Sequence, residues 1–182
     1  MTPVFLVAAR RSGTTLFRLM LDGHPEVHWV RGWEPVAEAL KTLSGPAAQP
    51  MEVDVEGLGP VSADSPSALR DGIETRIAAH LADHGKTMLG ATVHVGFRSL
   101  PDVWPEARYI HLIRDPRDIA ISNLKLAWAG HPFGAAHTWE TAERDWEKIR
   151  PRLRDDQWID IRYEDLVADP ERELGRVCDF LG

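Results

Sequence analysis

Two arginine-containing segments carry the side chains best suited to hold an anion. The first, Arg11-Ser12-Gly13-Thr14-Thr15, lies between an apolar run and a segment with helical spacing. In such a turn the backbone N–H groups and the N-terminus of the next helix point at a common ligand, and the helix dipole favours negative charge. The segment therefore predicts a phosphate-binding loop. A plain strand-to-helix turn that merely uses glycine is the structural alternative.

The spacing of this loop is close to that of the phosphate loop of ATPases and kinases, G-x4-G-K-[ST]. Thr14 stands at the position of the lysine, however, and Ala8 at that of the first glycine. A kinase-type loop would therefore lack its key residue. Arg11 places a cation before the glycine instead, from where it can reach a bound anion from the other side.

The second segment begins at Arg114, directly after the strand-like run Tyr109–Ile113. Ser122 follows about two helical turns into the next element, so an arginine fork and a hydroxyl could share one phosphate. Two structural alternatives stay open. Arg114 could instead form a salt bridge with Asp115 or Asp118 at the start of the helix, and Ser122 could be an ordinary helical serine.

Alternating strands and helices must position these segments. The predicted strands are Val4–Ala9, Thr87–Val95, Tyr109–Ile113 and Trp158–Tyr163. The predicted helices are Thr14–Leu21, Glu34–Leu43, Ser67–His84, Pro116–Ala129 with Asp115 as N-cap, Thr138–Leu153 and Pro170–Leu181. This order predicts an α/β fold of the P-loop-like, three-layer type, in which a central parallel sheet is flanked by helices. Ligands of such folds bind outside the carboxyl ends of the strands.

Composition limits the class of protein. The 182 residues fit one domain, and a hydrophobic content of 43% suffices for a core without metal or disulfide support. The net charge of −7 argues against a general nucleic-acid or anionic-membrane binder. Because the run Val4–Ala9 is too short for a signal core or a membrane span, we expect a soluble, cytoplasmic protein. Cys178 is the only cysteine, and we expect it to be a buried structural thiol.

Three segments together resemble the motifs of the PAPS-dependent sulfotransferases, where PAPS is 3′-phosphoadenosine 5′-phosphosulfate. Arg11–Leu16, followed by Leu21–Val27, resembles the 5′-phosphosulfate loop and helix of the bacterial and tyrosylprotein-type branch. Arg114–Asp118 with Ser122 looks like the family's 3′-phosphate motif, and Arg162–Leu166 resembles its nucleotide-contacting segment. The motifs occur in the family's order over nearly the whole chain.

The resemblance implies transfer of the sulfuryl group from PAPS to a hydroxyl or amine acceptor by in-line displacement, with PAP as the product. Such transfer asks for positioning and charge neutralisation, so we expect no metal. The acceptor would be a small molecule, a peptide or a glycan, and we expect neither a nucleic-acid nor a membrane partner. The implied cofactor-binding residues are Arg10, Arg11, Ser12, Gly13, Thr14, Thr15, Arg114, Ser122 and Tyr163.

The implied catalytic residues are Glu34 and Arg11. In similar enzymes a glutamate after the first helix is the base, and Gly32-Trp33-Glu34-Pro35 resembles that segment. Arg11 would offset charge on the leaving group. A solvated carboxylate at a helix start is the alternative for Glu34, and a core tyrosine at a strand edge is the alternative for Tyr163. His94 and His24 are weaker candidates for the base.

Some positions depart from the family pattern. Arg10 stands where the family carries proline, and Gly90–His94 replaces an often observed Lys-Thr-Pro, so Arg10 or Arg98 would have to replace the helper lysine. Relatives continue beyond Gly182 into a segment that closes over the nucleotide, so we expect a single domain, residues 1–182, without that segment. A nucleotide-binding module without turnover and a divergent P-loop kinase remain the alternative functions.

The segment Gly45–Pro66 interleaves glycine and proline with acidic residues. This composition predicts a long exposed loop. Loops of that length in a compact domain are either functional lids or poorly ordered. Its position after Glu34 suggests a lid on the acceptor side.

Overall fold

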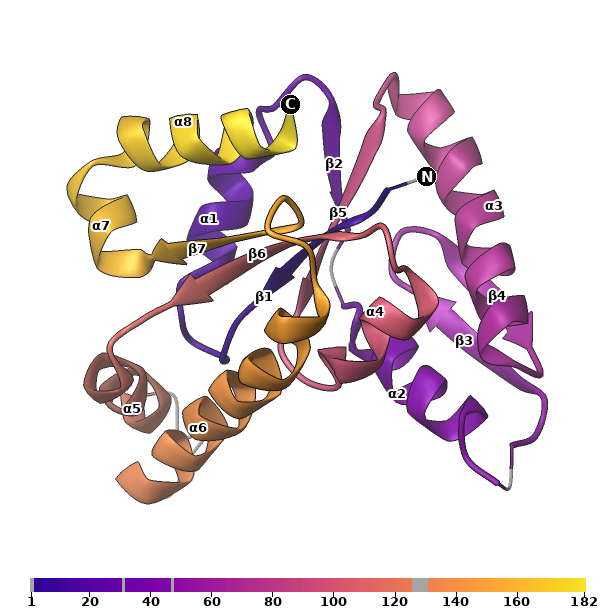
Figure 1. The fold of residues 1–182 in the computed structure, drawn as a ribbon, viewed down its shortest axis with the longest axis horizontal. Helices are drawn as coiled ribbons and strands as arrows, with labels where there is room; N and C mark the ends of the chain where they lie inside the picture. The colour runs from indigo at the N-terminus through magenta and orange to yellow at the C-terminus, as the bar shows by residue number, and fades with distance from the viewer. Residues whose placement is uncertain (1, 31, 47, 126–130) are drawn as a thin grey trace.

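The computed structural model describes residues 2–30, 32–46, 48–125 and 131–182 (Figure 1). Its centre is a five-stranded sheet in the order β2-β5-β1-β6-β7, and every neighbouring pair runs parallel. The strands are β1 (Val4–Val7), β2 (Val27–Val30), β5 (Met88–Val93), β6 (Arg108–Ile113) and β7 (Trp158–Arg162). A separate antiparallel hairpin is formed by β3 (Met51–Val55) and β4 (Gly59–Ala63).

Helices cover both faces of the sheet, which confirms the predicted three-layer α/β fold (Figure 1). One face packs against α1 (Thr14–Leu21), α7 (Tyr163–Ala168) and α8 (Pro170–Leu181). The other packs against the hairpin and against α2 (Glu34–Leu43), α3 (Pro66–His84), α4 (Leu100–Val103) and α6 (Pro132–Ile149). The short turns Phe97–Ser99 and Arg150–Arg152 are 3₁₀ helices, and α5 (Pro116–Lys125) contacts α6. None of the helices in the described ranges is both long and apolar enough to cross a membrane.

Strand β1 shows why the sheet is buried on both sides. Phe5 and Val7 join the apolar cluster on one face, whereas Val4 and Leu6 join the cluster on the other. A strand that is covered on both faces must be apolar at every position rather than at every second one. The uninterrupted apolar run that predicted a buried strand is therefore explained by its central place in the sheet.

The remaining predicted elements are present, with ends shifted by up to six residues: α6 begins at Pro132 rather than at the predicted Thr138. The sequence analysis missed β2, and it extended the last strand through Tyr163, which instead begins α7. The predicted end of one helix at Ala129 lies outside the described residues, since α5 is described to Lys125. Asp115 caps α5 as predicted: its Oδ1 accepts a hydrogen bond from the backbone N–H of Arg117 at 2.8 Å.

The prediction of a long exposed loop over Gly45–Pro66 is wrong. The hairpin places five side chains in the same apolar cluster as α2 and α3, and all are buried: Val53, Val55, Leu58, Val61 and Ala63. Glu52 and Asp54 alternate with the buried valines and face solvent, as the period of a half-buried strand requires. The hairpin is therefore part of the core, which also argues against its role as a lid.

The prediction of a buried cysteine is also wrong. Cys178 lies on α8 and is exposed. The buried face of this helix consists of Glu173, Val177 and Leu181, which are spaced at one helical turn. Because Cys178 directly follows Val177, it is turned about 100° away from that face towards solvent.

Candidate functional site

Each strand of the parallel sheet is followed, at its carboxyl end, by a residue that borders one of two adjoining cavities. The larger cavity has a volume of about 470 Å³ and the smaller of about 200 Å³. Thr14, Thr15 and His94 line both, so the two cavities are continuous parts of one site. The contributing residues are Arg11 after β1, Glu34 after β2, His94 after β5, Arg114 after β6 and Tyr163 after β7.

The loop after β1 has a backbone shaped for close approach of a ligand. Gly13 is the N-cap of α1 with φ +96°, and no side chain caps the helix there. Arg11 has φ +75°, a left-handed conformation that costs energy for a residue with a side chain and that is often found at ligand-binding loops. A Cβ atom at Gly13 would lie 2.3 Å from the ring of Tyr163. Glycine is therefore required here by both the backbone conformation and the close contact.

Two buried hydroxyl groups at this edge of the sheet have no hydrogen-bond partner within the described part of the chain. They are Ser12 Oγ and Thr92 Oγ1. Ser12 is only 1% exposed, and Thr92 lines the smaller cavity. A buried hydroxyl without a partner is costly, and such groups are commonly satisfied by a ligand or water. Together with the uncapped N-terminus of α1, these donors fit an anionic ligand.

The two predicted anion-binding segments contact each other directly. The Nε of Arg11 donates a hydrogen bond to Ser122 Oγ at 3.0 Å. The Nη1 of Arg114 donates to the backbone carbonyl of Arg11, also at 3.0 Å, and its guanidinium lies 4.2 Å from the ring centroid of Tyr163. One continuous group of residues is therefore formed by the loop after β1, the segment that begins at Arg114, and Tyr163. Most of its polar groups are hydrogen-bond donors.

The alternative assignment of Arg114 to a helix-start salt bridge is supported for Asp118 but not for Asp115. The Nη2 of Arg114 is 4.0 Å from Asp118 Oδ2, at the limit of an ion pair. Asp115 pairs with Arg117 instead, which lowers the pKa of Asp115 to about 2. The Nε of Arg114 is buried and has no hydrogen-bond partner in the described ranges.

Glu34 and His94 lie together in the smaller cavity. The Nη2 of Arg10 is 3.6 Å from Glu34 Oε1. Burial of the imidazole lowers the pKa of His94, although a hydrogen bond to the carbonyl of Ala8 and the charge of Glu34 oppose this effect. Because Nδ1 of His94 contacts that carbonyl at 3.1 Å, it must carry the proton, which leaves Nε2 as an acceptor. The site thus holds two groups able to accept a proton.

His24, the other histidine considered from the sequence, is not part of this arrangement. It is half-buried in the turn before β2, where its Nδ1 accepts a hydrogen bond from the backbone N–H of Glu26 at 3.2 Å. Of the two candidates for the helper cation, Arg10 borders the larger cavity of the site. Arg98 is 57% exposed and lies 3.7 Å from Asp145 at a different cavity.

Arg18 and Thr92 line the smaller cavity but were not named from the sequence. Arg18 follows Thr14 by one helical turn, so the two share a face of α1, and it is 8% exposed. That spacing could have identified Arg18 as a site residue from the sequence. Thr92 is one polar residue in a strand, and nothing in its sequence context distinguishes it.

A third cavity of about 940 Å³ adjoins the site at Glu34, which lines it as well. Its remaining walls come from α2, the segment Val95–Ser99, α4, α6 and the 3₁₀ helix Arg150–Arg152. Acidic and basic side chains alternate on it, among them Arg98, Asp145 and Lys148. Glu34 therefore lies between the anion-binding residues and a large cavity that carries charged side chains.

Comparison with known proteins gives one consistent result. Residues 3–182 match the family model described as the sulfotransferase family. The protein-tyrosine sulfotransferase A of Caenorhabditis elegans is 26% identical over 98% of this chain and 49% of its own length, so the chain spans about half of that relative. Among solved structures, the sulfotransferase domain from the curacin biosynthetic pathway has a TM-score of 0.68 at 21% identity, over 99% of this chain and 73% of that domain. A mouse sulfotransferase complexed with PAP has a TM-score of 0.61 at 16% identity, over 100% of this chain and 59% of that protein.

Proposed function

The chain belongs to the sulfotransferase family, and on that premise we propose that it transfers the sulfuryl group of PAPS to a hydroxyl or amine acceptor. The observation that carries the proposal is the contact between the loop after β1 and the segment after β6, through Arg11, Ser122 and Arg114. A donor with phosphate groups at both its 5′ and 3′ positions needs two such anion-binding segments side by side. The mouse sulfotransferase of similar fold was solved with PAP, a nucleotide of that kind.

We assign the 5′-phosphosulfate to the loop from Arg10 to Thr15. Its backbone N–H groups at the uncapped N-terminus of α1, with the hydroxyls of Ser12, Thr14 and Thr15, would donate hydrogen bonds to it. We assign the 3′-phosphate to Arg114 and Ser122. Tyr163 lines the same cavity and would contact the nucleotide. In this proposal residues 1–182 act as one nucleotide-binding domain.

PAPS supplies a sulfuryl group that is attached to a good leaving group, so the protein has to position the reactants and balance charge. Arg11 would offset the negative charge that grows on the leaving group. Glu34 would accept the proton of the acceptor, because it borders both the site of the loop and the 940 Å³ cavity. That cavity would then admit the acceptor, and its mixed charges suit a polar molecule, a peptide or a glycan.

Stabilisation of the protein by added nucleotides tests which nucleotide the site binds. The melting temperature should rise far more with PAP than with adenosine 5′-phosphate, and more than with ATP and magnesium. Equal shifts for PAP and adenosine 5′-phosphate would contradict the 3′-phosphate assignment, and a preference for ATP with magnesium would favour the kinase alternative. Release of PAP from PAPS in the presence of a panel of phenol, sugar and peptide acceptors then separates the enzyme from a binding module, which would bind PAP and release none.

A further inference from the structure

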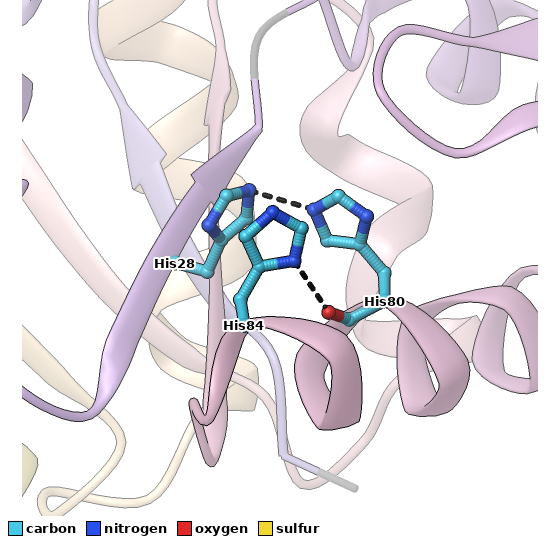
Figure 2. Close-up of side chains that lie close together, drawn as sticks. All are labelled: His28, His80 and His84. Atoms are coloured by element: carbon cyan, nitrogen blue, oxygen red, sulfur yellow. Dashed lines mark hydrogen bonds between the residues drawn. The ribbon is translucent and has the colours of Figure 1, made fainter.

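Three histidines converge at the amino end of the sheet, at the opposite end from the anion site. His28 is the second residue of β2, and His80 and His84 lie in the last turns of α3. Figure 2 shows the three rings facing one another. One ring nitrogen from each residue lies within 4.8 Å of the other two, and the Nε2 atoms of His28 and His80 are 2.8 Å apart.

The backbone holds these rings in place. Residues four apart share one face of a helix, so His80 and His84 both point towards β2. Between them Leu81 is buried in the main apolar cluster, which fixes this end of α3. His28 is held by the parallel pairing of β2 with β5, in which it lies opposite Leu89. His28 and His80 are half-buried and His84 is exposed, so an ion from solvent has a path to the rings.

The tautomer of His84 is set by its neighbour. Its Nδ1 lies 2.7 Å from the backbone carbonyl oxygen of His80, and a carbonyl can only accept, so Nδ1 carries the proton. The other nitrogen of the ring, which is free of that proton, points towards the other two rings (Figure 2). Metal-binding histidines are commonly oriented in this way, by donating their second nitrogen to a backbone carbonyl.

The local charges favour neutral rings, which are the form that binds metal. Partial burial and the neighbouring imidazoles lower the pKa of both His28 and His80. The charged groups near the cluster are Asp22, Asp83 and Lys86. Within the described residues, neither the Asp22 nor the Asp83 carboxylate forms an ion pair with the three rings. A set of three imidazoles without carboxylates suits zinc-like ions and does not suit calcium or magnesium, which prefer oxygen ligands.

We propose that His28, His80 and His84 bind one divalent transition-metal ion of the zinc class, through one nitrogen of each imidazole, and that a fourth position stays open to water. Zinc lies about 2.0–2.1 Å from each imidazole nitrogen, which in a tetrahedral site separates two ligand nitrogens by about 3.3 Å. The Nε2 atoms of His28 and His80 need to move apart only slightly from 2.8 Å. The ion replaces the proton that these two nitrogens now share.

The ion would connect the edge strand β2 to the end of α3, which the chain separates by 52 residues. Because the site lies at the amino end of the sheet, it is independent of the proposed transfer chemistry, which requires no metal. Its consequence is stabilisation of the folded state by a ligand that the unfolded chain binds less well.

Zinc titration of the untagged protein, treated first with a chelator, tests the site by calorimetry. We expect the wild type to bind one equivalent of Zn²⁺. The variants should each bind Zn²⁺ at least about tenfold more weakly; they are His28→Gln, His80→Gln and His84→Gln. His137→Gln, which changes an exposed histidine on α6, is the matched control and should bind like the wild type.

Two further measurements keep the result unambiguous. Co²⁺ should give the visible absorption of a four-coordinate site in the wild type and in His137→Gln only. Zn²⁺ should raise the melting temperature of the wild type, and a chelator should reverse the rise. Since His84 is exposed, His84→Gln should fold normally, as circular dichroism will verify. Equal zinc affinity of wild type and His84→Gln, or no stoichiometric binding by the wild type, would overturn the proposal.

Discussion

The two ends of the parallel sheet carry opposite chemistries. At the carboxyl end, Arg11 and Arg114 are permanently charged groups held by a hydroxyl, a backbone carbonyl and an aromatic ring. At the amino end, His28, His80 and His84 contact one another, and the pKa of the first two is lowered. In the two proposals above, one end binds an anion and the other a cation.

The difference follows from the backbone as much as from the side chains. At the carboxyl end the loops lead into helix N-termini, where unpaired N–H groups add positive potential for an anion. At the amino end α3 finishes beside β2, and the backbone carbonyl of His80 lies 2.7 Å from Nδ1 of His84. Because the ends are separated by the length of the sheet, a change at one should leave the other unaffected.

The largest expected effect is a loss of turnover when Glu34, at the carboxyl end of the sheet, is changed. Glu34→Gln keeps the size of the side chain but removes its basicity, so kcat should fall by ~10²–10⁴ while PAP affinity stays nearly constant. Zinc affinity should not change. Glu52→Gln, on the exposed face of the hairpin, is the matched control and should keep the wild-type kcat. Steady-state kinetics with PAPS and calorimetry with PAP provide both numbers.

If Glu34→Gln has only a small effect on kcat, His94 is the alternative base. His94 lines the same cavity as Glu34, its Nε2 is unprotonated because Nδ1 carries the proton, and burial lowers the pKa of its ring. If His94 is the base instead, His94→Gln should cause the large loss of kcat and Glu34→Gln should not. The pair of variants therefore identifies the base whichever residue it is.

A smaller effect is expected on nucleotide binding. Arg114→Ala should weaken PAP binding by about 1.5–3 kcal/mol, the range for hydrogen bonds to charged groups, which is roughly 10- to 150-fold. Arg117→Ala is the matched control from the same segment: its side chain is 86% exposed and pairs with Asp115. Affinity for adenosine 5′-phosphate should change little in either variant. Equal losses of PAP affinity in the two variants would show that only the general charge of the segment matters.

The residues that meet at the carboxyl end of the sheet could be predicted from the sequence far better than those that meet at its amino end, for a physical reason. Arg11 to Thr15 form a local motif, and the rule that parallel strands end at one edge brings residues such as Arg114 to the same place. The contact of Arg11 with Ser122 joins residues 111 apart and could not be derived from local pattern. The histidine cluster was out of reach because His28 lies on β2, a strand that the sequence analysis missed.

The hairpin and Cys178 show a second limit. Glycine and proline in Gly45–Pro66 masked the period of two in Val53, Val55 and Val61, which only their burial against α2 and α3 reveals. The exposure of Cys178 depends on the rotation of α8 about its axis. Burial was assigned to the cysteine from its residue type rather than from its place on the helix, one position beyond the buried Val177.

A third histidine environment lies between the two ends of the sheet and sharpens the comparison. His111 on β6 is 2% exposed and stacks on Trp146 at 4.6 Å between ring centroids. Its Nδ1 lies 2.9 Å from Asp160 Oδ1 on β7, and its Nε2 lies 3.5 Å from Glu143 Oε2 on α6. Burial alone would lower the pKa of His111, but the two carboxylates outweigh it and raise the pKa. Contact with carboxylates therefore separates this histidine from the cluster at the amino end.

The smallest predicted effect is a pH-dependent loss of stability in His111→Asn. Because the folded-state pKa of His111 lies above the ordinary value of 6.5, its ion pairs contribute fully below that pH and are lost as the pH rises through the folded-state pKa. Denaturant unfolding should show the variant to be less stable by roughly 1–3 kcal/mol near pH 6, with a smaller difference at higher pH. His137→Gln should show no such trend. A difference that is constant with pH would mean that His111 is neutral when folded, and the two carboxylates would then not set it apart from His28 and His80.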